Sequence, residues 1–128
     1  TMYRHLIHIS SHVFAKLNID KAKRMLSFSF PDITYTQRTI LTIPDDQEGS
    51  YPFRNVLGVF YTDLPLEEVI QKIKAIEHSL GKRSRDKDLG KVVIDLDLIQ
   101  YGEVILLDDY FDREHVQALL AELGEETR

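Results

Sequence analysis

Two aspartates, Asp95 and Asp97, occupy alternate positions in the apolar run at 92–99. Because strand side chains alternate between faces, both carboxylates are expected on one face and the intervening apolar side chains on the other. Positions two residues apart along a strand are separated by roughly 6.5 Å, so both carboxylates can bind one ion or two ions about 3.5–4 Å apart. Magnesium prefers oxygen ligands and is commonly bound together with substrate phosphate groups. The pattern indicates metal-phosphate chemistry. The alternative interpretation is that both carboxylates lie on the solvated face of an edge strand.

A basic segment at 82–91 precedes this run. It carries five basic side chains against two acidic ones, a net charge of +3, within a chain of net charge -5. The rest of the chain therefore carries -8. Local positive charge on an acidic protein fits a small anionic ligand and argues against a general nucleic-acid partner. By itself the segment is either a solvated loop or a phosphate clamp.

Composition narrows the class of protein. The 128 residues are 43% hydrophobic and 29% charged, which fits one soluble domain over 1–128 with a real core. There are no cysteines, so disulfides, thiolate metal sites and cysteine nucleophiles are excluded. No run approaches the ~18 apolar residues of a membrane span, and no signal-peptide pattern opens the chain. We expect a cytoplasmic protein without a membrane partner, and neither a Walker-type phosphate loop nor a Gly-x-Ser-x-Gly nucleophile motif is present.

The elements that would position the aspartates follow from hydrophobic periodicity and from breaks. Asn18 is a plausible N-cap for the first helix. Pro65 suits the first turn of the second helix, and Gly81 suits its end. Strands are expected at 3–9, 33–43, 54–61, 92–99 and 103–107, and helices at 19–27, 65–80 and 113–123. The order β-α-β-β-α-β, with an added hairpin strand and a final helix, predicts an α+β ferredoxin-like sandwich.

Four further side chains or segments can join the aspartates. Glu77 ends the second helix just before the basic segment. Asn55 lies in the third strand, where its amide can meet a polar heterocycle, and Phe53 lies on the same face and can stack on a flat ring. Thr42 and Pro44 are expected to line a lid beside them.

These residues carry a family resemblance. The segment 94–105 reads Ile-Asp-Leu-Asp-Leu-Ile-Gln-Tyr-Gly-Glu-Val-Ile. It resembles the Leu-Asp-Leu-Asp-Ile-Leu-x-Tyr-Gly-x-x-x-Ile signature of the 6-hydroxymethyl-7,8-dihydropterin pyrophosphokinases of folate biosynthesis. The aromatic-x-Asn segment at 53–55 and Ile76-Glu77 followed by Gly81-Lys82 also resemble family segments at agreeing spacing. The resemblance extends over 3–107.

The resemblance implies transfer of pyrophosphate from ATP to the hydroxymethyl group of a reduced pterin, with release of AMP. Asp95 and Asp97 would be the catalytic residues and would bind two Mg²⁺ ions together with the ATP phosphates. The residues implied at the pterin are Thr42, Pro44, Phe53 and Asn55. The residues implied at ATP are Glu77, Lys82, Arg83, Arg85, Lys91 and His115. The implied partners are small molecules alone, and the protein would be a monomer or a homodimer.

Several positions depart from the family pattern. The first strand ends Ser10-Ser11-His12 where the family has Gly-Ser-Asn, and Val92 replaces an arginine. Asp109 falls in a segment that replaces a Val-Pro-His motif. These changes leave open a catalytically impaired pterin- or nucleotide-binding homologue, a pyrophosphokinase with a different small substrate, or a structural domain that pairs through edge strands.

The histidines of the first strand point to opposite faces. His5 and His8 are three residues apart, and odd spacing along a strand reverses the face. Both are expected to be ordinary packed or solvent-exposed residues, with a ligand role as the alternative. His12 is expected to cap its turn or to lie beside the substrate.

Overall fold

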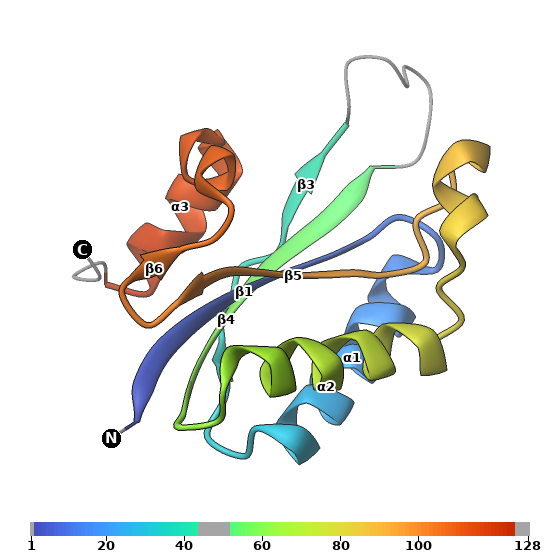
Figure 1. The fold of residues 1–128 in the computed structure, drawn as a ribbon. Helices are drawn as coiled ribbons and strands as arrows, with labels where there is room; N and C mark the ends of the chain where they lie inside the picture. The colour runs from blue at the N-terminus through green and yellow to red at the C-terminus, as the bar shows by residue number, and fades with distance from the viewer. Residues whose placement is uncertain (1, 44–51, 125–128) are drawn as a thin grey trace.

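The protein forms one antiparallel sheet with helices on both faces. The computed structural model describes residues 2–43 and 52–124 (Figure 1). The elements are β1 (Tyr3–Ser11), α1 (Ala15–Ser29), β2 (Thr34–Tyr35), β3 (Ile40–Thr42), β4 (Phe53–Thr62), α2 (Leu66–Ser79), η1 (Ser84–Leu89), β5 (Asp95–Tyr101), β6 (Val104–Ile105), η2 (Asp108–Asp112) and α3 (Glu114–Glu122). The strand order is β2-β4-β1-β5-β6, and β3 also pairs with β4. This topology confirms the predicted α+β ferredoxin-like fold with its added hairpin strand and helix.

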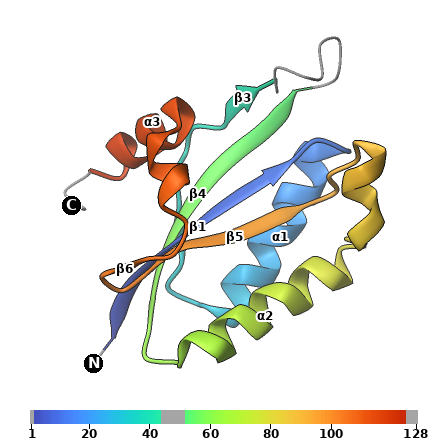
Figure 2. The ribbon, with the colours of Figure 1, turned by 45° about the horizontal axis from the view of Figure 1, so that its top comes forward.

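The two faces of the sheet carry different layers. α1 and α2 lie side by side on one face, and α3 lies on the other (Figures 1 and 2). Ile7 and Ile9 of β1 belong to the larger core, which also contains residues of α1 and α2. Leu6 belongs to a smaller core that includes Val116 and Leu119 of α3. Alternation along β1 therefore assigns odd-numbered side chains to one layer and even-numbered ones to the other.

The central strand β1 sets the register on the α3 face. His8 pairs with Leu57 of β4 on one side and with Asp97 of β5 on the other. Ser10 pairs in the same way with Asn55 and Asp95. On this face β1 first presents Leu6, which packs under α3, and then the polar side chains of His8 and Ser10 near its end. The polar ends of three strands thus meet beside η2 and the start of α3.

The first helix begins earlier than predicted. α1 starts at Ala15, and its N-cap is Phe14, which has a left-handed backbone with φ 45° and no capping side chain. Asn18 lies inside the helix, where its side chain donates a hydrogen bond to the Val13 carbonyl over 2.6 Å. The predicted N-cap was wrong because the amide bonds backward to the preceding turn and does not begin the helix.

The predicted strand at 33–43 is two short strands. β2 and β3 both pair with β4, and the chain between them leaves the ladder after Thr36, whose N–H donates to the Leu57 carbonyl over 2.9 Å. The backbone N–H groups of Gln37 and Arg38 donate to the Glu122 carboxylate of α3, over 2.5 and 3.0 Å. A distant carboxylate therefore satisfies two backbone donors where the chain leaves the ladder.

Other boundaries shift less. Ser10 and Ser11 belong to β1, which was predicted to end at residue 9, and β5 begins at Asp95, three residues later than predicted. The Val92 carbonyl instead accepts hydrogen bonds from the backbone N–H groups of His12 and Val13, over 3.0 and 3.3 Å. The predicted helices at 65–80 and 113–123 are confirmed as α2 and α3, and the hairpin strand shortens to β6.

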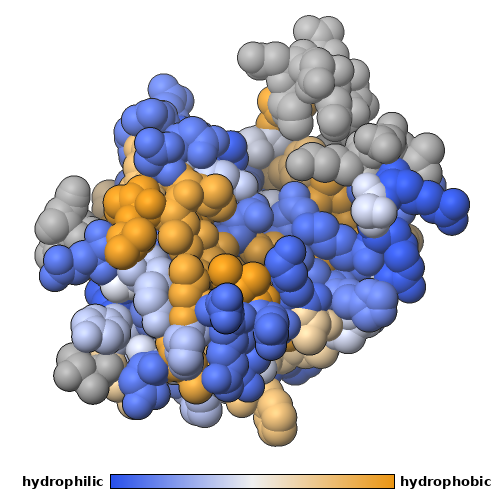
Figure 3. Space-filling model, in the orientation of Figure 1, coloured by the Kyte–Doolittle hydropathy of each residue, from blue (hydrophilic) through white to orange (hydrophobic). Residues whose placement is uncertain are grey.

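The surface is polar over much of the face seen in Figure 3, with an apolar area near α3 and β6. Val104 and Ile105 of β6 are 58% and 46% exposed. Within residues 2–43 and 52–124, no helix has both the length and the apolar character needed to cross a membrane.

Candidate functional site

A pocket of about 730 Å³ opens on the α3 face at the polar ends of β1, β4 and β5. Its walls are His8, Ser10, Thr42, Ile43, Phe53, Asn55, Asp95, Asp97, Tyr110, Arg113, Glu114 and His115. Six of these were predicted site residues: Thr42, Phe53, Asn55, Asp95, Asp97 and His115. The strand register explains the gathering, because alternation places the two aspartates, Asn55 and Phe53 on the same side of the sheet.

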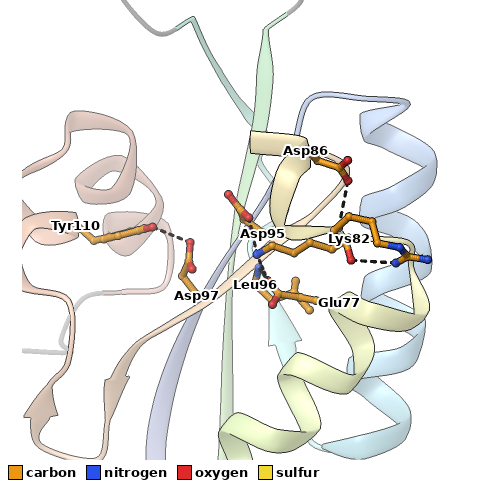
Figure 4. Close-up of polar contacts among 8 residues, drawn as sticks. Glu77, Lys82, Asp86, Asp95, Leu96, Asp97 and Tyr110 are labelled. Carbon is orange, nitrogen blue, oxygen red and sulfur yellow. Dashed lines mark hydrogen bonds and ion pairs between the residues drawn. The ribbon is translucent and has the colours of Figure 1, made fainter. Parts of the chain in front are cut away.

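The Asp95 side chain is linked through Lys82 to Glu77 at the end of α2. The Lys82 ammonium lies 2.8 Å from Asp95 Oδ1 and 2.9 Å from Glu77 Oε2 (Figure 4). Glu77 Oε2 also accepts the backbone N–H of Leu96 over 2.7 Å. Burial alone would lower the pKa of Lys82, but its hydrogen bonds to Asp95 and Glu77 outweigh this, so the pKa is raised. Lys82 is therefore a fixed positive charge beside Asp95, and Glu77 ties both to the start of β5.

Asp97 is bound from the opposite side. The Tyr110 hydroxyl of η2 donates to Asp97 Oδ2 over 2.6 Å (Figure 4). Burial raises the pKa of Tyr110, as does its hydrogen bond to Asp97, so the phenol stays protonated. The Arg113 guanidinium lies 3.8 Å from the centre of the Tyr110 ring and pairs with Asp109 over 3.1 Å. The segment between β6 and α3 thus closes one side of the pocket.

The predicted ring-binding residues are positioned by β3 and by the end of β1. Asn55 Nδ2 donates to the Ile40 carbonyl over 2.9 Å and to Thr42 Oγ1 over 3.0 Å, which fixes the orientation of the amide. The Phe53 ring stacks on the His12 ring, with centroids 4.8 Å apart and planes 17° apart. His12 therefore covers one face of Phe53.

His8 forms part of the pocket wall and is only 3% exposed. Among the described residues neither ring nitrogen has a partner in full hydrogen-bond geometry, although an interaction with the Asn55 side chain raises the pKa of His8. Burial, followed by the charges of His115 and Arg113, lowers the pKa of His8 to about 4. The ring meets Tyr110 edge-on at 5.3 Å and lies 5.6 Å from the His115 ring. His8 is therefore neutral, enclosed and unpaired.

The basic residues predicted at ATP are spread over a wider area. Lys82, Arg83, Lys91 and Asp95 line a smaller pocket of about 180 Å³, which adjoins the larger pocket at Asp95. Arg85 is exposed and belongs to neither wall. His115 lies in the larger pocket, away from this basic group, and burial lowers its pKa. Pro44 lies outside the described residues.

Six pocket residues were not predicted as site residues: His8, Ser10, Ile43, Tyr110, Arg113 and Glu114. His8 and Ser10 had a usable signal, since polar residues two apart on a buried strand share a face. Tyr110 and Arg113 had no such signal, because only the packing of η2 and α3 against the sheet brings them to the aspartates.

The donor set fits Mg²⁺ only in company with a phosphate ligand. Among the described residues no group of three His, Cys, Asp or Glu side chains is arranged to hold a metal. Asp95 and Asp97 supply two carboxylates on one pocket wall. Mg²⁺ commonly takes one or two carboxylates and completes its octahedron with water and substrate phosphate, so the pair fits that ion.

Comparisons with known proteins identify the family. No curated protein matches the chain. One similar solved structure is the solution NMR structure of a de novo designed protein with a ferredoxin fold, at 21% identity and a TM-score of 0.38, covering 83% of this chain and 92% of the designed one. The family model of 7,8-dihydro-6-hydroxymethylpterin-pyrophosphokinase (HPPK), a diphosphotransferase family, matches residues 8–125. Since this match covers nearly the whole chain, the chain belongs to the HPPK family.

Proposed function

We propose that this protein is a Mg²⁺- and ATP-dependent diphosphotransferase that acts on 6-hydroxymethyl-7,8-dihydropterin. The family match supports a pterin pyrophosphokinase-like function. The observation that carries the specific reaction is the placement of Asp95 and Asp97 on one pocket wall with Asn55 and Phe53. Carboxylates for metal-phosphate chemistry and groups suited to a flat polar ring then border the same space.

The reaction requires one displacement at phosphorus. The hydroxymethyl oxygen forms a bond to the β-phosphorus of ATP, the bond from that phosphorus to the α,β-bridging oxygen breaks, and AMP leaves with the bridging oxygen. The hydroxyl proton passes to a base or to solvent, and Asp95 is our candidate for polarising this hydroxyl. Catalysis of this kind consists mainly of positioning and charge neutralisation.

Asp95 and Asp97 would hold two Mg²⁺ ions, which supply positive charge to the phosphates when bound. Lys82, Arg83 and Lys91 surround the adjoining pocket and would attract the phosphate chain. Lys82 is already fixed between Asp95 and Glu77, so it would meet the phosphates as a positioned charge. Arg85 and His115 remain weaker candidates for ATP because they lie away from that pocket.

Asn55 would read the polar edge of the pterin, and Phe53 would stack on its ring. The hydrogen bonds of Asn55 to β3 support this role, because a fixed amide recognises a ring edge at lower entropic cost. Thr42 borders the same space and orients the amide. Pro44 stays a prediction from the sequence resemblance.

The test is AMP formation from Mg²⁺, ATP and the reduced pterin. We expect AMP to appear with the wild-type protein and to fall by at least about 100-fold in Asp95→Asn and Asp97→Asn, a size typical of lost charge stabilisation. The exposed Asp63, outside the pocket, provides the matched control Asp63→Asn. A folded wild-type protein that forms no AMP above background refutes the enzyme. Pterin binding without AMP would instead establish the impaired binding homologue.

A further inference from the structure

Helix α1 carries apolar side chains on two opposite sides. Ile19, Ala22 and Leu26 are buried in the larger core beneath the helix. On the side that faces away from the core, Leu17 and Phe28 are 52% and 90% exposed. These two side chains lie roughly 16 Å apart along the helix axis. The outer side of α1 therefore presents apolar surface at both ends without covering it.

Two cations lie between these apolar side chains. Lys21 and Arg24 are exposed, and at about 3.6 residues per turn they fall on the same outer side, within an arc of about 60°. Neither makes a hydrogen bond or an ion pair with a described residue, and the nearby Asp20 carboxylate is paired with Lys16 over 2.9 Å. The four outer side chains are called the basic stripe here: Leu17, Lys21, Arg24 and Phe28.

The residue that precedes α1 adds a third exposed apolar side chain. Phe14 has φ 45°, a left-handed backbone in which a bulky residue is an outlier. Its ring is 80% exposed, so packing within the described chain does not offset that conformation. Among the large apolar side chains of residues 2–43 and 52–124, Phe14 and Phe28 are the most exposed. A strained residue whose ring packs against nothing in its own chain indicates a contact with another molecule.

The α3 side of the sheet carries a patch of complementary charge. Val104 and Ile105 of β6 are 58% and 46% exposed, and Figure 3 shows an apolar area near this strand. Asp108 and Asp112 of η2 are exposed, and their carboxylates have no hydrogen-bond or ion-pair partner among the described residues. These four residues are called the acidic patch. Its two apolar side chains and two carboxylates match the two apolar side chains and two cations of the basic stripe.

We propose that the basic stripe of one molecule docks on the acidic patch of a second copy of this chain. Opposite charges and exposed apolar side chains then meet in one contact. Pairing of the stripe with itself would bring two copies of Lys21 and Arg24 together, and this repulsion disfavours a symmetric contact. Because α1 and α3 lie on opposite faces of the sheet, the contact is head-to-tail and generates an open chain or a ring (Figures 1 and 2). This proposal does not rest on the proposed function.

The test is sedimentation velocity of the whole chain with paired charge reversals. In about 0.05 M salt the wild type should self-associate between micromolar and millimolar concentrations, and about 0.5 M salt should weaken the association. Lys21→Glu with Arg24→Glu, the stripe variant, should weaken it by about 10-fold or more. Asp108→Lys with Asp112→Lys, the patch variant, should do the same. An equimolar mixture of the two variants should restore association, because each reversed surface then meets its complement.

The control separates local pairing from a general increase in negative charge. Arg38→Glu with Lys74→Glu changes the net charge by the same amount as the stripe variant, at exposed positions outside both surfaces. We expect this control to weaken association less than the stripe variant does. Equal losses in the two would mean that net repulsion alone is at work, and would overturn the proposal.

Other results also contradict the docking. A wild type that stays monomeric at millimolar concentration in low salt refutes it, as does a mixture of the two variants that sediments no faster than either alone. A monomeric wild type that binds vesicles of phosphatidylcholine and phosphatidylglycerol, with binding lost in the stripe variant, would assign the stripe to an anionic membrane instead. Should the patch variant fail to fold by circular dichroism, the stripe variant, its control and the salt dependence still decide.

Discussion

Burial of His8 makes the free energy of unfolding depend on pH. The pKa of His8 is about 4 in the folded protein, against 6.5 for an unperturbed histidine. Between these values the unfolded chain binds a proton that the folded protein does not, so stability falls as the pH decreases. The contribution is complete above pH 6.5 and lost progressively down to pH 4. At 1.36 kcal/mol for each pKa unit, the loss amounts to about 3 kcal/mol.

The perturbation that isolates this effect is His8→Phe. The phenyl ring preserves the contact with Tyr110 and cannot be protonated, so stability should change less between pH 7 and pH 4, by about 3 kcal/mol. His5, whose pKa burial also lowers, lies on the opposite face of the sheet, remains in both proteins and cancels in the difference. Urea denaturation at half-unit pH steps, followed by circular dichroism, measures the curves.

His78→Phe serves as the control, because His78 is exposed on α2 and should leave the pH dependence unchanged. Parallel curves for the wild type and His8→Phe would refute the reasoning, since they would mean that folding does not exclude the proton from His8. A curve that differs with the opposite slope would mean that His8 is charged in the folded state.

Three further predictions concern stability and metal binding. Glu77→Ala removes the acceptor of the Leu96 N–H and one partner of Lys82, and should lower the free energy of unfolding by about 1–3 kcal/mol in chemical denaturation. The exposed Glu68→Ala should cost little, and equal losses in the two variants would contradict the bridging role of Glu77. Gly58→Ala places a methyl group 3.1–3.2 Å from side-chain atoms of three neighbours and should cost about 1–3 kcal/mol by overpacking, with an unchanged melting temperature as the contrary result. Tyr110→Phe removes the hydrogen bond to Asp97 and should tighten Mg²⁺ binding about 2- to 10-fold, which corresponds to a net hydrogen bond of about 0.5–1.5 kcal/mol. Calorimetry with a non-hydrolysable ATP analogue measures this affinity. Weaker binding would show that the phenol supports the metal site.

Local sequence determined the elements that build the site. The alternation of Asp95 and Asp97 with buried Leu96 and Leu98 gave a strand with one carboxylate face, and the burial pattern agrees. The order of strands and helices followed from periodicity, which depends on neighbours along the chain. Because both signals are local, the ferredoxin-like fold and the shared face of the two aspartates were predictable.

Element boundaries depended on contacts that are distant in sequence. The strand predicted at 33–43 is interrupted where Glu122 of α3 accepts the N–H groups of Gln37 and Arg38. α1 begins early because Phe14 adopts a left-handed backbone that a non-glycine residue seldom takes. Neither event has a signature in the neighbouring residues.

The sequence by itself therefore determined the family, the fold and the carboxylate pair, since each is encoded by residue type and spacing. Only the tertiary structure decided what surrounds that pair. Packing of η2 and α3 across the sheet brings Tyr110 to Asp97 and encloses His8. An enclosed and unpaired imidazole arises from three-dimensional exclusion of water, a property of the packed layers that no spacing along the chain records.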